Sequence, residues 1–366
     1  MCIAHDGLEE LLEIHKYFHI LLALAKKNHN FDNMKALSQF ILLVVILLAA
    51  TGQAQNLQFN RNREFKIVQF TDLHYKLHNP ASQVVPECIS EIVKAEKPDL
   101  IIVTGDFVYS RPADSTLTAV LNIIEAQNTP FIMLFGNHDS ERGMTNGELQ
   151  RVIATYKHNV ITAPYDSITP DHVITIKDHS GSRDAALLYC FDTHANAQIK
   201  EVGGYAWLTG EQVQWYSSQS ASFTRSNGGV PLPALAFMHI PLPEYAEAAT
   251  TQDAILIGTR MEAVCCPKIN TGMFAAMRIS GDVMGIFSGH DHDNDYATMW
   301  HGILLAYGRF TGGNTEYNHL SSGARVIVLK EGQRSFETWI RLRGGQTQDH
   351  TVYPTSYIKD NWRLRK

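Results

Sequence analysis

Residues 131–139 read Phe-Ile-Met-Leu-Phe-Gly-Asn-His-Asp, an apolar run that stops at a glycine and three polar side chains. This is the pattern of a buried parallel strand that delivers chemical groups at its carboxyl end. Residues 66–74 have the same form and end in Thr-Asp-Leu-His, and residues 99–106 end in Thr-Gly-Asp. The Asp, Asp and Asn after these strands lie 34 and 31 positions apart, about the length of one strand-helix-strand unit. Three successive strand ends are therefore predicted to meet.

The rest of the chain extends this pattern into two sheets. Residues 65–165 alternate apolar runs with segments of helical spacing, which is typical of a mostly parallel sheet covered by helices. A capping box predicts a helix from Thr209, and residues 217–233 have the composition of a loop. Further strands are predicted at 173–176, 185–191, 235–238, 283–287, 298–307, 324–330 and 336–342. The predicted fold class is α/β, with two packed mixed β-sheets flanked by helices in one domain.

The amino terminus carries a targeting pattern. Lys35 precedes an apolar run over residues 40–50, and Gly52-Gln53-Ala54 forms a small-x-small cleavage site. The run is short for a membrane span, although an uncleaved anchor is the alternative interpretation. We expect an N-terminal extension at 1–33, a signal peptide at 34–54 and one domain at 55–366. The mature protein is then exported, periplasmic or secreted, with no membrane span.

Charge and cysteine content restrict the function further. The chain has 366 residues and a formal net charge of −6, so it lacks the basic excess of a sequence-independent nucleic-acid binder, and no stable nucleic-acid partner is expected. Cys88 and Cys190 lie in apolar patterns and are predicted to be small core residues. The adjacent Cys265 and Cys266 are poorly placed to form a disulfide with each other.

Five predicted strands end in side chains that bind metal ions. A single Asp or His at such a position is more often a cap or a hydrogen-bonded structural residue, but five such ends together indicate an ion site. Mixed Asp, Asn and His ligands without cysteine favour iron, manganese or zinc. The set exceeds the needs of one ion, and a carboxylate bridging two ions about 3.5–4 Å apart is a common device for hydrolysing phosphate esters. The candidate ligands are Asp72, His74, Asp106, Asn137, His239, His290 and His292.

These blocks, taken in order, resemble the calcineurin-like metallophosphatase superfamily over about residues 64–343. The blocks are Asp72-Leu73-His74, Gly105-Asp106, Gly136-Asn137-His138-Asp139, His239 and Gly289-His290-Asp291-His292. The run Gly105-Asp106-Phe107-Val108-Tyr109 is similar to the purple-acid-phosphatase-like branch. His74 is similar to the histidine kept in the first metal motif by a single-domain subgroup. The resemblance implies the α/β/β/α metallophosphatase sandwich.

The resemblance also implies roles for single residues. One ion would be held by Asp72, His74, Asp106 and His292, and the other by Asn137, His239 and His290, with Asp106 bridging. A metal-bound hydroxide is the implied nucleophile. His138 would contact the substrate phosphate or protonate the leaving oxygen, and Asp139 would orient His138.

Residues near these blocks are further candidates. Tyr109 is either a ligand, as in the colour-bearing purple acid phosphatases, or packs beside the site. Arg142, Asp192 and His194 are candidate substrate-binding residues. Tyr205 is predicted to be a packing residue.

The expected function is hydrolysis of phosphate monoesters on a small phosphorylated substrate by an enzyme with two metal ions. A phosphodiesterase of the same fold, acting on nucleotide or lipid headgroup diesters, is the nearest alternative. A non-catalytic metal-binding member is a second alternative, which the complete ligand set disfavours.

Overall fold

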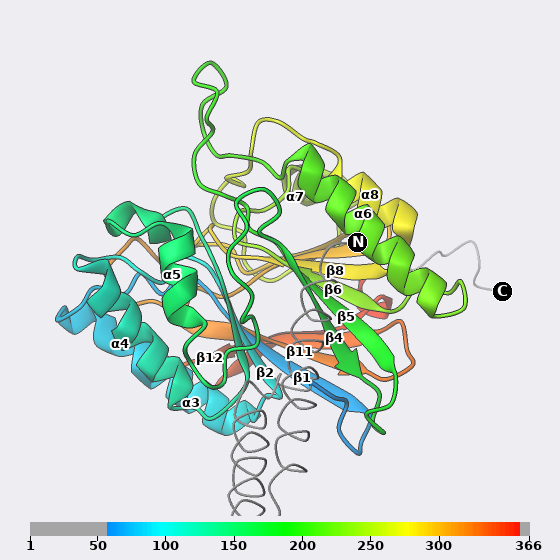
Figure 1. Ribbon diagram of the computed structural model, residues 1–366, viewed down its shortest axis with the longest axis horizontal. Helices are drawn as coiled ribbons and strands as arrows, with labels where there is room; N and C mark the ends of the chain where they lie inside the picture. The colour runs from blue at the N-terminus through cyan, green and yellow to red at the C-terminus, as the bar shows by residue number, and fades with distance from the viewer. Residues whose placement is uncertain (1–56, 359–366) are drawn as a thin grey trace, which may run out of the picture. The chain divides into compact units, whose positions relative to one another are not determined.

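The computed structural model describes residues 57–358 (Figure 1). The predicted N-terminal extension and signal peptide lie outside the described residues. Within residues 57–358, no helix combines the length and the apolar character needed to cross a membrane.

Two mixed β-sheets form the centre of the fold. One has six strands in the order β13-β12-β11-β1-β2-β3, and the other has seven in the order β4-β5-β6-β8-β10-β9-β7. The strands are β1 (Glu64–Phe70), β2 (Leu100–Thr104), β3 (Phe131–Leu134), β4 (His172–Lys177), β5 (Asp184–Cys190), β6 (Ala234–Phe237), β7 (Leu256–Ile257), β8 (Val283–Ser288), β9 (Ala297–Trp300), β10 (Ile303–Tyr307), β11 (Gly323–Lys330), β12 (Phe336–Leu342) and β13 (Thr347–Tyr353). The predicted fold class is confirmed.

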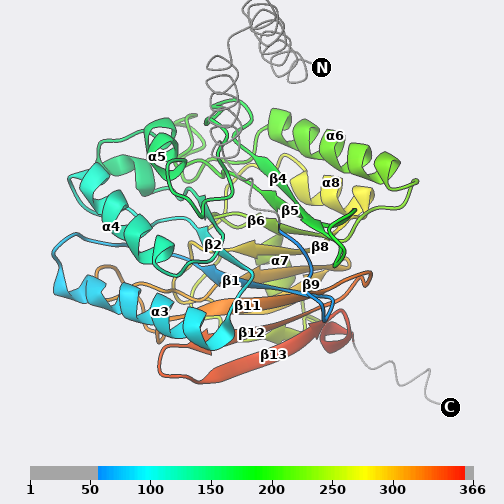
Figure 2. The same ribbon diagram turned by 60° about the horizontal axis from the view of Figure 1, so that its bottom comes forward.

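Helices cover the outer faces of the sheets (Figure 2). They are α3 (Val84–Glu96), α4 (Ala113–Glu125), α5 (Asn146–Ile153), α6 (Gly210–Ser226), α7 (Glu244–Thr250) and α8 (Met273–Ser280), with the short 3-10 helices η1 (Pro80–Gln83), η2 (Asp139–Arg142) and η3 (Thr355–Tyr357). In β1, Ile67 joins the core between the sheets, while Val68 and Phe70 join the cluster formed with α3, α4 and α5. A third cluster packs α6, α7 and α8 against the seven-stranded sheet. Cys88 and Cys190 are buried free thiols, as predicted.

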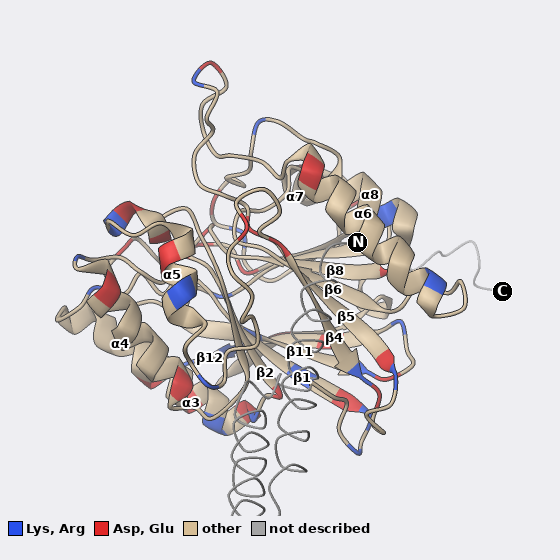
Figure 3. Cartoon of the chain, viewed as in Figure 1, with Lys and Arg blue, Asp and Glu red and all other residues tan. Residues whose placement is uncertain are grey.

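Parallel pairing determines where the strand ends lie. β1, β2 and β3 are parallel neighbours, and so are β5, β6, β8 and β10. The carboxyl ends of parallel strands share one edge of a sheet, so each sheet presents a row of loops at such an edge. Lys and Arg are interspersed with Asp and Glu in the view of Figure 3, in keeping with the absence of a basic excess.

Two predictions about local structure were wrong. Residues 217–226 are helical rather than loop, because α6 continues to Ser226. Tyr216 and Ser220 are buried at helical spacing, and the hydroxyl of Ser217 donates to the carbonyl of Val213 within the helix. The predicted strand 298–307 is a hairpin of β9 and β10, whose turn has positive φ at both His301 and Gly302.

Candidate metal centre

The two sheets deliver the predicted ligands to one place. Asp72, Asp106 and Asn137 follow strands of the six-stranded sheet, whereas His239 and His290 follow strands of the seven-stranded sheet. Their ligand atoms form two groups, each within 4.8 Å: Asp72, His74 and His292, and Asp106, His239 and His290. All six side chains are buried. The structure therefore brings together six of the seven predicted ligands in two neighbouring groups.

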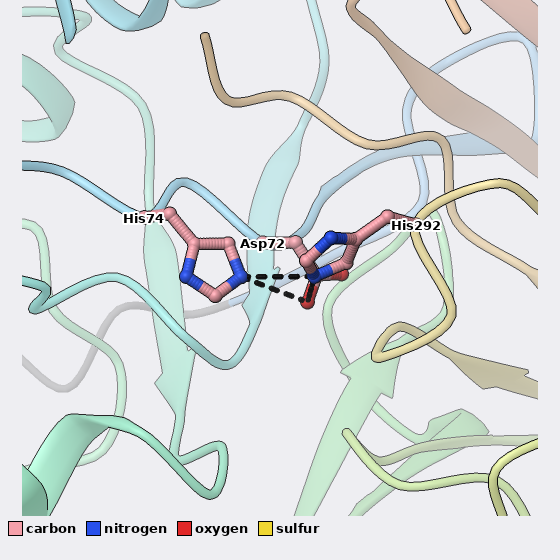
Figure 4. A group of neighbouring side chains, drawn as sticks. All are labelled: Asp72, His74 and His292. Carbon is pink, nitrogen blue, oxygen red and sulfur yellow. Dashed lines mark hydrogen bonds and ion pairs between the residues drawn. The ribbon is translucent and has the colours of Figure 1, made fainter. Parts of the chain in front are cut away.

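The first group converges on the Oδ1 oxygen of Asp72 (Figure 4). Asp72 Oδ2 accepts hydrogen bonds from the Thr71 hydroxyl at 2.7 Å and from the His290 backbone N–H at 3.0 Å. The other oxygen, Oδ1, is buried and has no hydrogen-bond partner. It lies 3.8 Å from His74 Nε2 and 3.6 Å from His292 Nε2, and these two nitrogens are 3.0 Å apart.

The second group converges on His239 Nε2. His239 Nδ1 lies 2.7 Å from the Thr104 carbonyl oxygen, so Nδ1 carries the proton and Nε2 presents its lone pair in the neutral ring. His239 Nε2 lies 3.1 Å from Asp106 Oδ2 and 3.1 Å from Asn137 Oδ1. His290 Nδ1 is 3.3 Å from the same nitrogen. Asn137, the seventh predicted ligand, therefore lies beside this group.

This arrangement fits metal ions. Each group directs several buried lone pairs at one small region, and hydrogen bonds among these atoms leave Asp72 Oδ1 without a partner. Cations satisfy such atoms, because buried polar groups left unpaired are costly. Asp106 Oδ2 lies 3.1 Å from His239 Nε2 and 3.8 Å from His74 Nε2, so it reaches both groups. That position is the one expected for a bridging carboxylate.

The backbone around the site is held in an unusual conformation. Four of the candidate ligands have positive φ without being glycine: Asp72 at 53°, His74 at 39°, Asp106 at 55° and His290 at 78°. Positive φ costs free energy in non-glycine residues and clusters at functional sites. Glycine is required beside these ligands, since a Cβ on Gly136 would lie 2.2 Å from Asp106 Oδ1. The chain path here serves ligand placement rather than local stability.

Charges within the site favour metal-binding protonation states for Asp72, His74 and His290, whereas His239 holds a proton that a metal ion would replace. Burial opposes ionisation of Asp72, yet the neighbouring rings of His292 and His239 lower its pKa to about 2. Burial lowers the pKa of His74 to about 4 and that of His290 to about 3, so both rings are neutral at neutral pH. Burial also opposes charge on His239, but the carboxylate of Asp106 raises its pKa to about 10. Without a cation, a proton therefore occupies the space between these two side chains.

His138 differs from the ligand histidines in its exposure. Its side chain is 32% exposed, whereas those of His74 and His239 are 0% exposed. Its backbone N–H donates to Asp106 Oδ1 at 2.8 Å, and its ring Nδ1 lies 2.9 Å from Glu141 Oε2. His138 is thus attached to the metal centre through its backbone, while its ring faces the accessible side.

The predicted contact between Asp139 and the His138 ring is wrong, because Glu141 fills that position. Asp139 is fully buried and accepts four backbone hydrogen bonds of 2.7–2.9 Å, from Gly136, Asp106, Phe107 and Val108. Burial and the nearby Asp106 raise the pKa of Asp139 to about 7, while these N–H donors favour its ionised form. Asp139 therefore ties the loop after β3 to the loop after β2.

Asp139→Asn is expected to destabilise the protein by about 3 kcal/mol, because an amide NH2 would face backbone N–H donors. Urea unfolding in the presence of a chelator measures this loss without a contribution from bound metal. The control is Asp166→Asn, since Asp166 is exposed and accepts N–H bonds that an Asn oxygen also accepts. A loss as small as that of the control would contradict the joining role of Asp139.

Tyr109 packs beside the first group of ligands. Its ring meets the His74 ring edge-on with centroids 4.6 Å apart, and its hydroxyl donates to Glu316. Burial and this bond raise the pKa of Tyr109 to about 12. Arg142 Cζ lies 4.6 Å from the centroid of the Tyr109 ring. Of the two roles predicted for Tyr109, packing beside the site matches these contacts.

Asp192 and His194 belong to a different network. Asp192 accepts hydrogen bonds from Tyr165 and Asn146, and His194 Nε2 lies 3.0 Å from Gln212 Oε1. No hydrogen bond or ion pair within residues 57–358 connects either side chain to the candidate ligands. The Asp192 contacts join the end of β5 to the start of α5 and the loop after α5, and the His194 contact joins the same segment to the start of α6, which is a structural task.

Several residues of the site were missed by sequence analysis. Tyr205 was expected to be a packing residue, but its half-buried ring meets the ring of His290 with centroids 4.4 Å apart. Tyr317 stacks on His292 at 4.4 Å and supplies the carbonyl that holds His292 Nδ1 at 2.8 Å. The contact between Glu141 and the His138 ring was also missed, and its only sign in the sequence is the position of Glu141 three residues after His138.

Comparison with known proteins agrees with this geometry. The model of the family described as calcineurin-like phosphoesterase matches residues 65–294. "Probable inactive purple acid phosphatase 29" of Arabidopsis thaliana is 28% identical and covers 84% of this chain and 92% of its own length. "Phosphatase DCR2" of Saccharomyces cerevisiae is 27% identical, covering 80% of this chain and 56% of its own length.

A solved structure shares the fold. A dimetal phosphatase from Danio rerio superposes with a TM-score of 0.54 at 12% identity, covering 78% of this chain and 99% of that one. The family match spans more than half of the chain, and the Arabidopsis relative aligns along most of both proteins. The chain belongs to the calcineurin-like phosphoesterase family, in its purple-acid-phosphatase-like branch.

Proposed function

We propose that the protein is a phosphoesterase with two metal ions that hydrolyses phosphate monoesters. The observation that carries this proposal is the pair of buried ligand groups joined at Asp106 Oδ2. Asp72, His74 and His292 would hold one ion and Asn137, His239 and His290 the other, with Asp106 shared. The donor set of carboxylate, amide and imidazole suits iron, manganese or zinc. The bound ions would supply Lewis acidity and an activated water.

The chain itself supplies a proton donor for the leaving oxygen. His138 is the accessible histidine at the mouth of the site, and Glu141 holds its Nδ1. With Nδ1 engaged, Nε2 is the ring nitrogen left for proton transfer to the ester oxygen.

Two other functions are consistent with the family. A phosphodiesterase would use the same ligands on nucleotide or lipid headgroup diesters. A non-catalytic metal-binding role is suggested by the printed names of relatives such as "Probable inactive purple acid phosphatase 14" of Arabidopsis thaliana. The complete ligand set and the accessible His138 favour the enzyme.

The proposed location is outside the cytoplasm. It rests on the apolar run before Gln55 and the small-x-small site at residues 52–54. Amino-terminal sequencing of the protein purified from its source tests it, since a chain that begins at Gln55 is expected.

Metal analysis combined with two substrates tests the proposed function. The protein spanning 55–366 is expected to contain about two metal equivalents and to hydrolyse p-nitrophenyl phosphate faster than bis-p-nitrophenyl phosphate. The reverse order of rates would select the diester function. Two equivalents with no turnover on either compound would favour the non-catalytic role. No metal after reconstitution with iron, manganese and zinc would refute the phosphoesterase function and the non-catalytic metal-binding role alike.

A further inference from the structure

The surface next to Glu141, the carboxylate partner of the His138 ring, carries two arginines. A surface hollow of about 570 Å³ opens next to η2 and the start of α4. It is lined by Arg111, Pro112, Ala113, Asp114, Arg142, Gly143 and Met144. Two guanidinium groups thus line one hollow next to the residue assigned to proton transfer.

The two arginines are poorly neutralised by protein carboxylates. Arg111 donates to the backbone carbonyl of Glu141 at 3.5 Å and makes no ion pair within residues 57–358. Among the described residues, the one ion pair of Arg142 is with Glu141, at 3.7 Å, and Glu141 is shared with His138. Arg142 Nε is buried, so the outer nitrogens of its guanidinium, on a side chain that is 30% exposed, are the ones that can reach the hollow. These groups retain donors for an anion that enters the hollow.

The acidic residue in the lining, Asp114, makes no ion pair with Arg111 or Arg142 within residues 57–358. The carboxylate of Asp114 accepts hydrogen bonds from the backbone N–H and the hydroxyl of Ser115, at 2.7 and 3.3 Å. Gly143 has φ of 108°, and a Cβ there would lie 3.3 Å from Arg111 Nη1. The glycine therefore leaves room for the Arg111 guanidinium along the wall of the hollow.

The hollow is separated from the metal centre by one side chain. The Tyr109 ring touches the candidate ligand His74 with centroids 4.6 Å apart and lies 4.6 Å from Arg142 Cζ. At most twice that distance separates the guanidinium carbon from the His74 ring. A small molecule with two anionic groups spans such a gap.

We propose that Arg111 and Arg142 form a subsite that binds a second phosphate or carboxylate group of the substrate. This inference rests on the proposed function, since it assigns the class of monoester: one with a second anionic group close to the scissile phosphate. Arginine suits this task because its planar donors match the oxygens of both groups. The subsite thus selects substrates and leaves the hydrolytic step to the metal centre.

Matched substrates and matched variants test the subsite. Phenyl phosphate and 1,3-phenylene bisphosphate differ only in the second anionic group. The ratio of kcat/KM for the bisphosphate to that for the monophosphate is expected to fall about tenfold in Arg111→Gln and in Arg142→Gln. The control Arg151→Gln removes an exposed arginine of α5 and should leave the ratio unchanged. High salt should lower the wild-type ratio, because it screens the attraction.

Binding provides a readout that does not depend on turnover. Calorimetric titration of the metal-loaded protein with each compound is expected to show the same selective loss of bisphosphate affinity in both variants. If neither compound is hydrolysed but the selective loss persists, the proposed function fails and the subsite stands. Equal kcat/KM and affinity ratios in wild type, Arg111→Gln and Arg142→Gln would overturn the subsite even in an active enzyme.

Discussion

Metal content is expected to fall from about two equivalents to one or fewer when Asp106 is replaced by asparagine. Asp106 Oδ2 reaches His239 in one ligand group and His74 in the other, so the carboxylate serves both ions. An amide has no negative charge to share. Loss of groups that only support metal ligands costs about 10–100-fold in affinity, and loss of the shared ligand should cost at least about 100-fold.

Elemental analysis after dialysis measures this change. The control is Asp282→Asn, because Asp282 is equally buried and accepts hydrogen bonds from Tyr189 and Tyr216 away from the ligands. That variant is expected to lose stability and keep its metal. Two equivalents retained in Asp106→Asn would rule out a bridging role for Asp106.

His138→Ala is expected to lower kcat by about 10²–10⁴-fold while leaving both metal ions bound. The ring of His138 is not part of either ligand group; it meets the ring of His74 with centroids 5.6 Å apart, and the backbone N–H of His138 donates to Asp106. Removal of the side chain therefore takes away the proton donor and leaves the ligands in place. Turnover of p-nitrophenyl phosphate and metal content are measured on the same preparation.

The control for this variant is His158→Ala. His158 Nδ1 lies 2.7 Å from Glu125 Oε1, so it repeats the His–Glu pair of His138 and Glu141 at another place. Its carbonyl accepts the N–H of Phe131 at the start of β3, opposite the end that carries the site. Full activity in both variants would show that His138 has no role in proton transfer.

The parts of the fold that follow from local patterns were predictable from the sequence. Apolar runs that stop at Asp, Asn or His gave β1, β2, β3, β6 and β8, and the ligands lie just beyond them. Parallel pairing then forces those ends together, so the convergence of Asp72, Asp106 and Asn137 needed no knowledge of tertiary contacts.

Contacts between distant loops were not predictable in this way. Glu316 bonds to Tyr109 across 207 positions, and the carbonyl that holds His292 belongs to Tyr317. Neither residue stands in a periodic or motif-like context. Asp139 was misjudged because proximity in sequence to His138 suggested a side-chain contact, whereas the buried carboxylate is directed at backbone N–H groups. The second half of α6 was predicted to be a loop, because its serine-rich composition was given more weight than the helical spacing of its buried residues.

Because ligands for each proposed ion come from the ends of strands in both sheets, the ions would also act as a staple across the sandwich. Asp72 and His74 follow β1 in one sheet, and His292 follows β8 in the other. A ligand that binds only the folded state raises its stability by about 2.7 kcal/mol at a hundred times its dissociation constant. Melting temperature should then report metal occupancy directly, so candidate metals can be ranked before any natural substrate is known.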